Sequence, residues 1–205
     1  MCFAELEDGE AISAFYLLKN KLYYNSKIYN GFYLYAAATD KKSRGKGVMA
    51  KLINEAKLYC EENGYDFISL VPSEESLYGY YSRFCFVNSM YSFSHSHTDS
   101  DFCSTISPDV YYLLRKKYCT DHIVFDEKAF MYAAESLNAA GYRFYSNDKS
   151  IFIKNSESDY IEYLSVETCE ADKIERYPFG MLCPINPELK RDWKYTDIYM
   201  NIALD

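Results

Sequence analysis

The chain has 205 residues, of which 49% are hydrophobic, and a formal net charge of −8 with a pI near 5.0. This size and composition allow a buried core in one or two compact domains, and the negative charge argues against a nucleic-acid partner. Seven cysteines without a CxxC pair are typical of reduced thiols, so we expect a cytoplasmic protein. The sequence shows no secretory leader and no apolar run long enough for a membrane span.

The first part of the chain alternates between predicted strands and helices. Asp8-Gly9 separates two strand-like runs and predicts a hairpin. An apolar strand is followed by a helix whose apolar positions recur at helical spacing and whose stop signal is Asn63-Gly64. The predicted strands are Cys2–Leu6, Ala11–Leu18, Phe32–Thr39 and Phe67–Val71, and the helices begin at Val48 and Ser76. This order predicts a mixed sheet with helical crossovers.

The second part begins after a polar stretch, His95–Pro108, that we interpret as a loop or linker. Asp126 is a predicted helix N-cap and Gly141 a stop signal. The expected helices are Pro108–Tyr118 and Glu127–Ala140, and the expected strands are Tyr142–Tyr145, Ile151–Lys154, Tyr160–Val166, Met181–Ile185 and Ile198–Ile202. We expect two domains, residues 1–98 and a smaller α+β domain at residues 108–205.

The segment between Thr39 and Val48 is the strongest functional signal. Gly45 and Gly47 let the backbone approach an anion closely, and the first N–H groups of the following helix point toward it. Five cations lie within eleven residues and reinforce the attraction: Lys41, Lys42, Arg44, Lys46 and Lys51. The segment therefore predicts a site for a phosphate-bearing cofactor.

Three types of phosphate-binding loop compete for this segment. A P-loop requires GxxxxGK[ST], which is absent. A dinucleotide fingerprint is matched by Gly45-x-Gly47-x-x-Ala50, but five residues separate the strand from the first glycine, where that fingerprint has almost none. The third type is Q/R-x-x-G-x-G/A, the pyrophosphate loop of the GCN5-related N-acetyltransferases (GNAT). Residues 44–49, RGKGVM, resemble it at every defined position except Met49.

A second segment extends the resemblance to this family. Residues 76–86, SLYGYYSRFCF, are similar to the helix and strand start written LYxKxGF in many members, with Cys85 in place of the glycine that makes a tight turn. The run Ser73–Gly79, SEESLYG, resembles the tandem-domain branch typified by the enhanced intracellular survival acetyltransferases, in which a bulky residue at the place of Met49 is tolerated. The resemblance covers about Cys2 to Val87.

The resemblance implies an α/β (α+β) fold with a mixed, mainly antiparallel sheet and flanking helices. The family fold places a strand and two helices ahead of the hairpin, and this chain has almost nothing before Cys2. Without these amino-terminal elements, one face of the sheet would be left open, and open apolar faces are interaction surfaces. We therefore expect the segment after Pro108 to pack on the first domain, with a homodimer completing the burial.

The resemblance also implies acetyl-CoA as cosubstrate. The backbone N–H groups of a strand would stabilise the oxyanion that forms as a neutral amine attacks the thioester. The loop N–H groups would hold the pyrophosphate. Transferred to this sequence, the strand residues are Ala37, Ala38 and Thr39, and the loop residues are Arg44, Gly45, Lys46, Gly47 and Val48.

A tyrosine would assist the departing thiolate, since a simple thiol has a pKa of about 8.5 and a nearby phenol can donate a proton to it. The family's tyrosine lies four residues before the glycine of LYxKxGF, which is Tyr81 here, whereas alignment to the tandem branch favours Tyr78. Both tyrosines can also be purely structural. Glu74, Glu75 and a water are possible bases for deprotonation of the amine. In the tandem branch the chain's own C-terminal carboxylate enters the site, so the resemblance adds Asp205 as a candidate.

Two functions remain open at this stage. The first is an N-acetyltransferase that acts on a small amine or a protein amine. The second is a degenerate member that binds CoA or a protein without catalysis, suggested by Met49, Cys85 and the absent amino-terminal elements. We interpret Cys85 as a small core thiol, and the His95–Cys103 run as a solvated loop rather than a metal site.

Overall fold

The computed structural model describes residues 1–95, 103–118, 121–157, 160–165, 174–193 and 198–199. Asp205 lies outside the described residues, as do residues 96–102 of the expected linker. Within the described part, no helix is both long and apolar enough to cross a membrane.

The amino-terminal half begins with three antiparallel strands, β1 (Cys2–Glu7), β2 (Glu10–Tyr24) and β3 (Lys27–Thr39). β2 and β3 are longer than predicted, because they continue into a second hairpin at Asn25-Ser26, where both residues have positive φ. Asn20 interrupts the apolar pattern of β2, yet it is buried and its Nδ2 donates to Ser69 Oγ at 2.8 Å. A buried polar residue within a strand interrupts the apolar alternation from which strands are predicted.

The rest of this half follows the predicted order. After a short 3-10 helix at Lys41–Ser43 come α1 (Val48–Glu62), β4 (Phe67–Leu70), α2 (Glu75–Ser82) and β5 (Val87–His95). Gly31 in β3 faces β4 so closely that a Cβ there would overlap the backbone oxygen of Phe67. Glycine at this position lets the two strands start their parallel pairing.

The carboxyl-terminal half contains more strand than predicted. Asp126 caps α4 by accepting a hydrogen bond from Ala129 N at 2.9 Å, as the sequence predicts. The elements are β6 (Ser104–Thr105), α3 (Pro108–Tyr118), β7 (His122–Phe125), α4 (Glu127–Ala139), β8 (Arg143–Ser146), β9 (Ser150–Lys154), β10 (Tyr160–Ser165), β11 (Ile174–Pro184), α5 (Pro187–Asp192) and β12 (Ile198–Tyr199).

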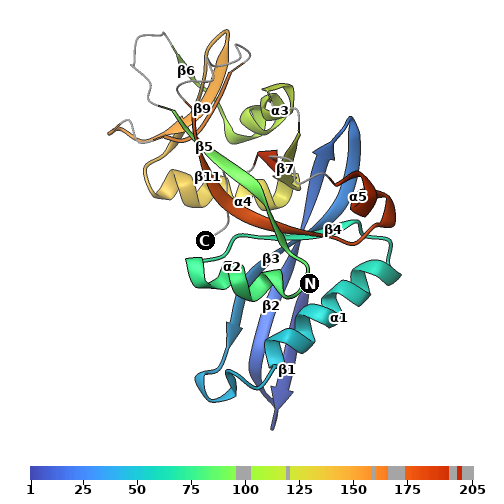
Figure 1. Ribbon diagram of the computed structural model, residues 1–205. Helices are drawn as coiled ribbons and strands as arrows, with labels where there is room; N and C mark the ends of the chain where they lie inside the picture. The colour runs from blue at the N-terminus through green and yellow to red at the C-terminus, as the bar shows by residue number, and fades with distance from the viewer. Residues whose placement is uncertain (96–102, 119–120, 158–159, 166–173, 194–197, 200–205) are drawn as a thin grey trace.

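Strands from both halves form one mainly antiparallel eight-stranded sheet in the order β1-β2-β3-β4-β11-β5-β12-β7. β7 also pairs with β2 at Asn20–Tyr23, beyond the part of β2 that β1 occupies, so the sheet closes on itself. β6, β8, β9 and β10 form a separate four-stranded sheet beside α3 and α4 in the upper half of the molecule (Figure 1).

This topology confirms that the segment after Pro108 packs on the first part of the chain. β11 inserts between β4 and β5, and β7 takes the free edge of β2. The expected mixed α+β fold with a mainly antiparallel sheet is also confirmed. The homodimer and the division into residues 1–98 and 108–205 stay predictions.

The large sheet separates two hydrophobic clusters. Neighbouring residues of one strand face opposite sides, so Phe32 and Leu34 pack toward α1 while Tyr33 packs toward the other cluster. The cluster under α1 contains Leu52, Ile53, Ala56 and Cys60 of that helix. The α1 side of the sheet therefore has a hydrophobic core of its own, and this core fixes the position of α1 and of the loop that precedes it.

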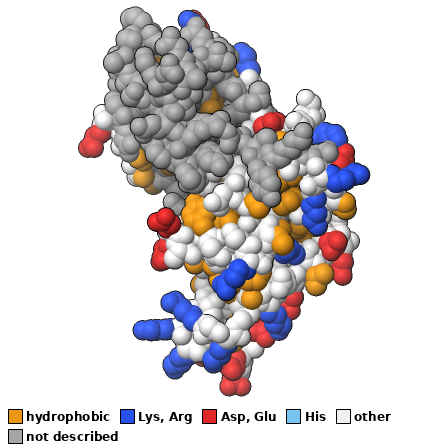
Figure 2. All heavy atoms as spheres, in the orientation of Figure 1, with side chains coloured by type: hydrophobic (Ala, Val, Ile, Leu, Met, Phe, Trp, Pro, Cys, Tyr) orange, Lys and Arg blue, Asp and Glu red, His pale blue; other side chains and the backbone are white. Residues whose placement is uncertain are grey.

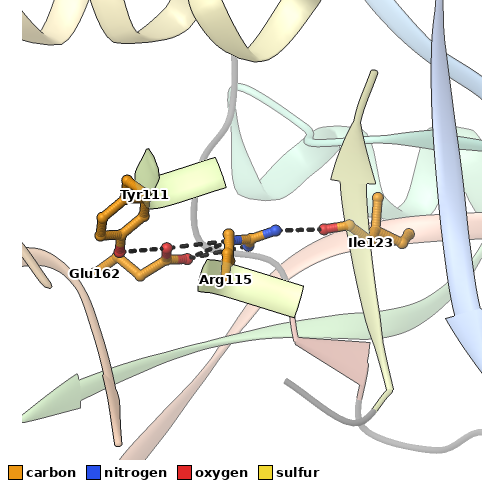
Figure 3. Close-up of polar contacts among 4 residues, drawn as sticks. All are labelled: Tyr111, Arg115, Ile123 and Glu162. Carbon is orange, nitrogen blue, oxygen red and sulfur yellow. Dashed lines mark hydrogen bonds and ion pairs between the residues drawn. The ribbon is translucent and has the colours of Figure 1, made fainter. Parts of the chain in front are cut away.

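The second cluster contains a buried ion pair (Figure 3). Arg115 of α3 and Glu162 of β10 have side chains that are 3% and 0% exposed, with Nη2 and Oε1 at 3.0 Å. Tyr111 donates its hydroxyl to Glu162 Oε2 at 2.7 Å, and Arg115 Nη1 donates to Ile123 O at 3.1 Å. These contacts join α3, β10 and β7 and satisfy both charges internally.

Candidate active site

A cavity of about 860 Å³ opens where β3 and β4 separate. Their parallel pairing covers only Gly31–Tyr33 of β3, and the strand then continues beyond the end of β4. The backbone of Ala37–Thr39 lines the cavity at this point. Because the β4 side of β3 is unpaired there within the described ladder, backbone groups on that side are open to a ligand, except Thr39 O, which accepts from Arg44 Nε.

A β-bulge shapes this part of β3. Tyr35 pairs with Tyr16 and Ala38 with Ala14, so Ala36 and Ala37 together oppose the single residue between Ala14 and Tyr16. Ala36 adopts φ +52, which is a strained conformation for a residue with a Cβ. Bulges re-aim the strand residues beside them, and retained strain of this kind is concentrated at functional sites.

The glycine loop closes one end of the cavity. Gly45 and Gly47 have φ of +76 and +81 and both line it, as do Arg44, Val48 and Met49. Gly47 is the N-cap of α1 and brings no side-chain acceptor to the first turn. The N–H groups of that turn are therefore left for an external acceptor, and the helix dipole favours an anion. This is the geometry that the sequence predicts for a phosphate-binding loop.

The cations of the loop are not equivalent. Figure 2 shows Lys and Arg side chains gathered at the lower left of the molecule, where Figure 1 places the loop between β3 and α1. Lys51 is already paired within the protein: its Nζ donates to both Glu5 carboxylate oxygens at 2.8 and 2.9 Å, and this bond raises the pKa of Lys51. Arg44 Nε donates to Thr39 O at 3.0 Å and ties the loop to β3. Lys46 is exposed and does not line the cavity.

α2 forms the opposite wall. Tyr81 lines the cavity and is only 7% exposed, and burial raises the pKa of its phenol to about 12. Tyr80 also lines the cavity, with the Arg83 guanidinium 4.7 Å from its ring centre. Glu74, one of the expected bases, lines it at the amino end of α2. Sequence reasoning missed Tyr80, which stands where the motif LYxKxGF has its leucine.

Tyr78 is not among the residues that line this cavity. Its ring packs against the cluster under α1, and partial burial raises its pKa. Ser82 Oγ donates to its carbonyl at 2.8 Å, which is a contact within the helix. The helical spacing of α2 thus brings Tyr81 to the cavity and leaves Tyr78 outside its lining.

The structure answers two questions that the sequence raises about Cys85: whether its thiol is buried, and whether the turn after α2 can form without glycine. Cys85 is exposed, so its interpretation as a small core thiol is wrong. It nevertheless adopts φ +66, and its N–H bonds to Ser82 O at 3.2 Å, so the tight turn forms without glycine. The turn that ends α2 survives the substitution at the cost of a strained residue.

The comparisons agree with this geometry. A strand, a glycine loop at a helix N-terminus and an aromatic helix wall lie within the first 86 residues. Residues 2–86 match the family model of the acetyltransferase (GNAT) domain. The matched region holds Ala37–Thr39, the glycine loop and Tyr81, and it is 85 of 205 residues long, so the model leaves the carboxyl-terminal half unassigned. No curated protein sequence matches the chain.

Solved structures share the fold over most of the chain. Eis1 from Mycobacterium abscessus is 10% identical, covering 89% of this chain and 63% of its own, with a TM-score of 0.68. A probable N-acyltransferase of unknown function from Enterococcus faecalis V583 is 10% identical, with coverages of 90% and 62% and a TM-score of 0.64. A GCN5-related N-acetyltransferase from Kribbella flavida is 11% identical, with coverages of 88% and 59% and a TM-score of 0.62.

These likenesses concern the fold. The chain spans about 60% of the length of each of these three structures. The carboxyl-terminal half is part of the shared architecture, since close to nine-tenths of the chain is covered in each case. Membership of the tandem-domain branch and the missing amino-terminal elements stay predictions.

Proposed function

We propose that the protein is an N-acetyltransferase that transfers the acetyl group of acetyl-CoA to an amine by direct attack. One observation carries the proposal: unpaired strand backbone, an uncapped helix N-terminus with two glycines, and a buried phenol line the same cavity. The match of residues 2–86 to the GNAT domain supports it. The acceptor is a small-molecule or protein amine, and we place the enzyme in the cytoplasm as a homo-oligomer.

In this proposal the loop N–H groups from Arg44 to Val48 bind the pyrophosphate. The acetyl thioester lies against Ala37–Thr39, where N–H groups stabilise the oxyanion. The cavity of about 860 Å³ falls within the size range of cofactor sites. The residues present therefore suit the cosubstrate, and the bulky Met49 is accommodated as part of the cavity lining.

Tyr81 is the proposed donor to the departing CoA sulfur. Its raised pKa keeps the phenol protonated throughout the physiological range, so the donor is always present. Because a phenol with a pKa of about 12 is a weaker acid than a thiol, its main contribution is a hydrogen bond as charge builds on sulfur. Glu74 is the proposed base, directly or through a water, since it lines the same cavity.

The test compares three tyrosines of one helix. Tyr81→Phe keeps the ring and removes the hydroxyl, so acetyl transfer should fall by about 10² to 10⁴-fold with little change in acetyl-CoA affinity. Tyr78→Phe is the matched control outside the cavity lining, and Tyr80→Phe is the control inside it. A large loss for Tyr78→Phe alone would support the tandem-branch alignment instead.

The second candidate function is a degenerate protein that binds CoA or a protein partner without catalysis. Strain and substitution at Cys85 and the bulky Met49 favour it. Calorimetry with acetyl-CoA and turnover on a broad amine panel distinguish the two. Binding of acetyl-CoA without turnover of any amine in the panel selects the degenerate binder.

A further inference from the structure

A second cavity, of about 450 Å³, lies on the other side of the turn that follows α2. Two cysteines from distant parts of the chain line it, Cys85 of the turn and Cys183 of β11. Cys85 is exposed to solvent, whereas Cys183 is 1% exposed. Both are free thiols in this structure.

The two thiols meet at one backbone carbonyl. Cys183 Sγ donates to Phe84 O at 3.6 Å, and Lys57 Nζ donates to the same oxygen at 3.0 Å. Cys85 is the next residue along the chain. A trans peptide places its Cα about 3 Å from that oxygen, so the Cys183 sulfur lies within roughly 6.5 Å of the Cys85 Cα.

The strand register brings the two cysteines to the same end of the β11–β5 ladder. Leu182 pairs with Val87 across the β11–β5 ladder, and Cys183 and Cys85 follow one and two residues beyond that pair. Cys85 lies in the turn just before β5, next to the end of this ladder, and disulfides join Cα atoms roughly 4.4 to 6.8 Å apart.

The surroundings assign different roles to the two thiols. Cys85 is accessible from solvent, and the Lys57 and Lys190 side chains line the same cavity, with Glu61 as the one acidic residue in the described lining. Burial raises the pKa of Cys183 to about 11, the Lys57 ammonium opposes that rise, and the neighbouring Cys85 adds to it. Cys85 is therefore the thiol that reacts first, and Cys183 is the one that follows.

We propose that Cys85 and Cys183 are a redox-active thiol pair that reacts with small disulfides entering this second cavity. The Cys85 thiolate attacks one sulfur of the reagent RSSR, forming a Cys85–SR bond and releasing RS⁻, which takes up a proton. Cys183 loses its proton and attacks the Cys85 sulfur, which releases the second RS⁻. The protein is oxidised by two electrons, and RSSR is reduced to two RSH.

The bond would fix the turn at Arg83–Cys85 to β11. Arg83 and Phe84 line the first cavity, and Cys85 lines the second, so this short turn separates the two. The oxidation state of the pair would thus restrain one wall of the first cavity. The proposal stands on the thiols and does not depend on acetyl transfer.

The test uses the folded, reduced protein with glutathione disulfide as the probe. Alkylation of the remaining thiols, digestion and mass spectrometry should reveal a Cys85–Cys183 linked peptide, which dithiothreitol removes. Cys85→Ser should abolish the link and leave Cys183 unmodified, because that thiol is buried. Cys103→Ser, at an exposed cysteine that lines neither cavity, should leave the link unchanged.

Three outcomes overturn the proposal. One is stable glutathione on Cys85 with Cys183 still free. Another is a link from Cys183 to the buried Cys60, whose pKa is raised by burial and by the nearby Cys183. The third is modification confined to the exposed Cys2 and Cys103. All three outcomes are measured on the unmodified protein, so the test remains decisive even if the Cys85→Ser variant fails to fold.

Discussion

Polar groups gather in two regions of this molecule, and the two regions differ in whether the protein itself supplies the bonding partners. Around Arg115 and Glu162, every described contact closes inward: the guanidinium, the carboxylate and the Tyr111 hydroxyl are bonded to one another or to Ile123 O (Figure 3). Around Gly45 and Gly47, the helix N-terminus has no side-chain cap and the cations lie in solvent. The first arrangement stabilises a fold, and the second leaves capacity for a ligand.

The largest effect should follow from breaking the closed region. Arg115→Met leaves Glu162 buried without its charge partner, and such a loss destabilises proteins by about 3–5 kcal/mol. Urea unfolding at neutral pH measures the difference. Adding Glu162→Leu should recover most of it, since removal of both charges is close to neutral. Glu188→Ala, which breaks the exposed Lys27–Glu188 pair, is the control, with an expected loss of at most about 1 kcal/mol.

Tyr81 shares a property with each region: its phenol is buried, like the Arg115–Glu162 pair, and it lines the open cavity. Its pKa is raised from 10.0 to about 12, so the folded state holds the phenolic proton more tightly than the unfolded state does. Its contribution to stability is complete below pH 10 and is lost as the pH rises toward 12. Tyr81→Phe should therefore lose about 2 kcal/mol less stability than the parent over this range. Equal alkaline losses in both proteins would contradict the burial of an ionisable phenol.

The open region is tested by giving the loop a side chain. Gly47→Ala and Gly9→Ala place a Cβ at φ +81 and +84, with nothing within 4 Å in either case. Both should cost about 1 kcal/mol of stability through backbone strain. We expect Gly47→Ala alone to weaken acetyl-CoA binding, by about tenfold or more, because the Cβ stands where the phosphate approaches. Calorimetry that finds the same affinity in both variants would remove the loop from the proposed site.

The smallest effect concerns the turn after α2. Cys85 adopts φ +66, so Cys85→Gly should stabilise the protein, by about 1 kcal/mol at most, because relief of the strain is partly offset by the freedom that glycine gains when unfolded. Thermal unfolding measures the shift, and Cys103→Gly serves as a comparison at an exposed cysteine for which no positive φ is recorded. A lower unfolding temperature for Cys85→Gly would show that the turn gains more from the cysteine side chain than it loses to strain.

The sequence by itself determined the local elements and the loop. α1 spans Val48–Glu62 as its apolar spacing and Asn63-Gly64 predict, α4 begins after its Asp126 cap, and Gly47 lies at the amino end of α1, as the predicted phosphate loop requires. These features depend on residues that are close in the chain, so hydrogen-bonding capacity and backbone freedom decide them. The second hairpin at Asn25-Ser26 escaped prediction because neither residue is a glycine and Asn20 breaks the pattern.

Only the tertiary structure decided which distant residues and strands lie next to each other. Arg115 and Glu162 are 47 residues apart, and nothing in their local sequence indicates a pair. β11 enters the sheet between β4 and β5 from a distant part of the chain, which brings Cys183 to Cys85. The rotation of α2 chose Tyr81 over Tyr78 for the cavity wall. Long-range pairing and helix rotation follow from burial of the whole apolar surface, which no short segment encodes alone.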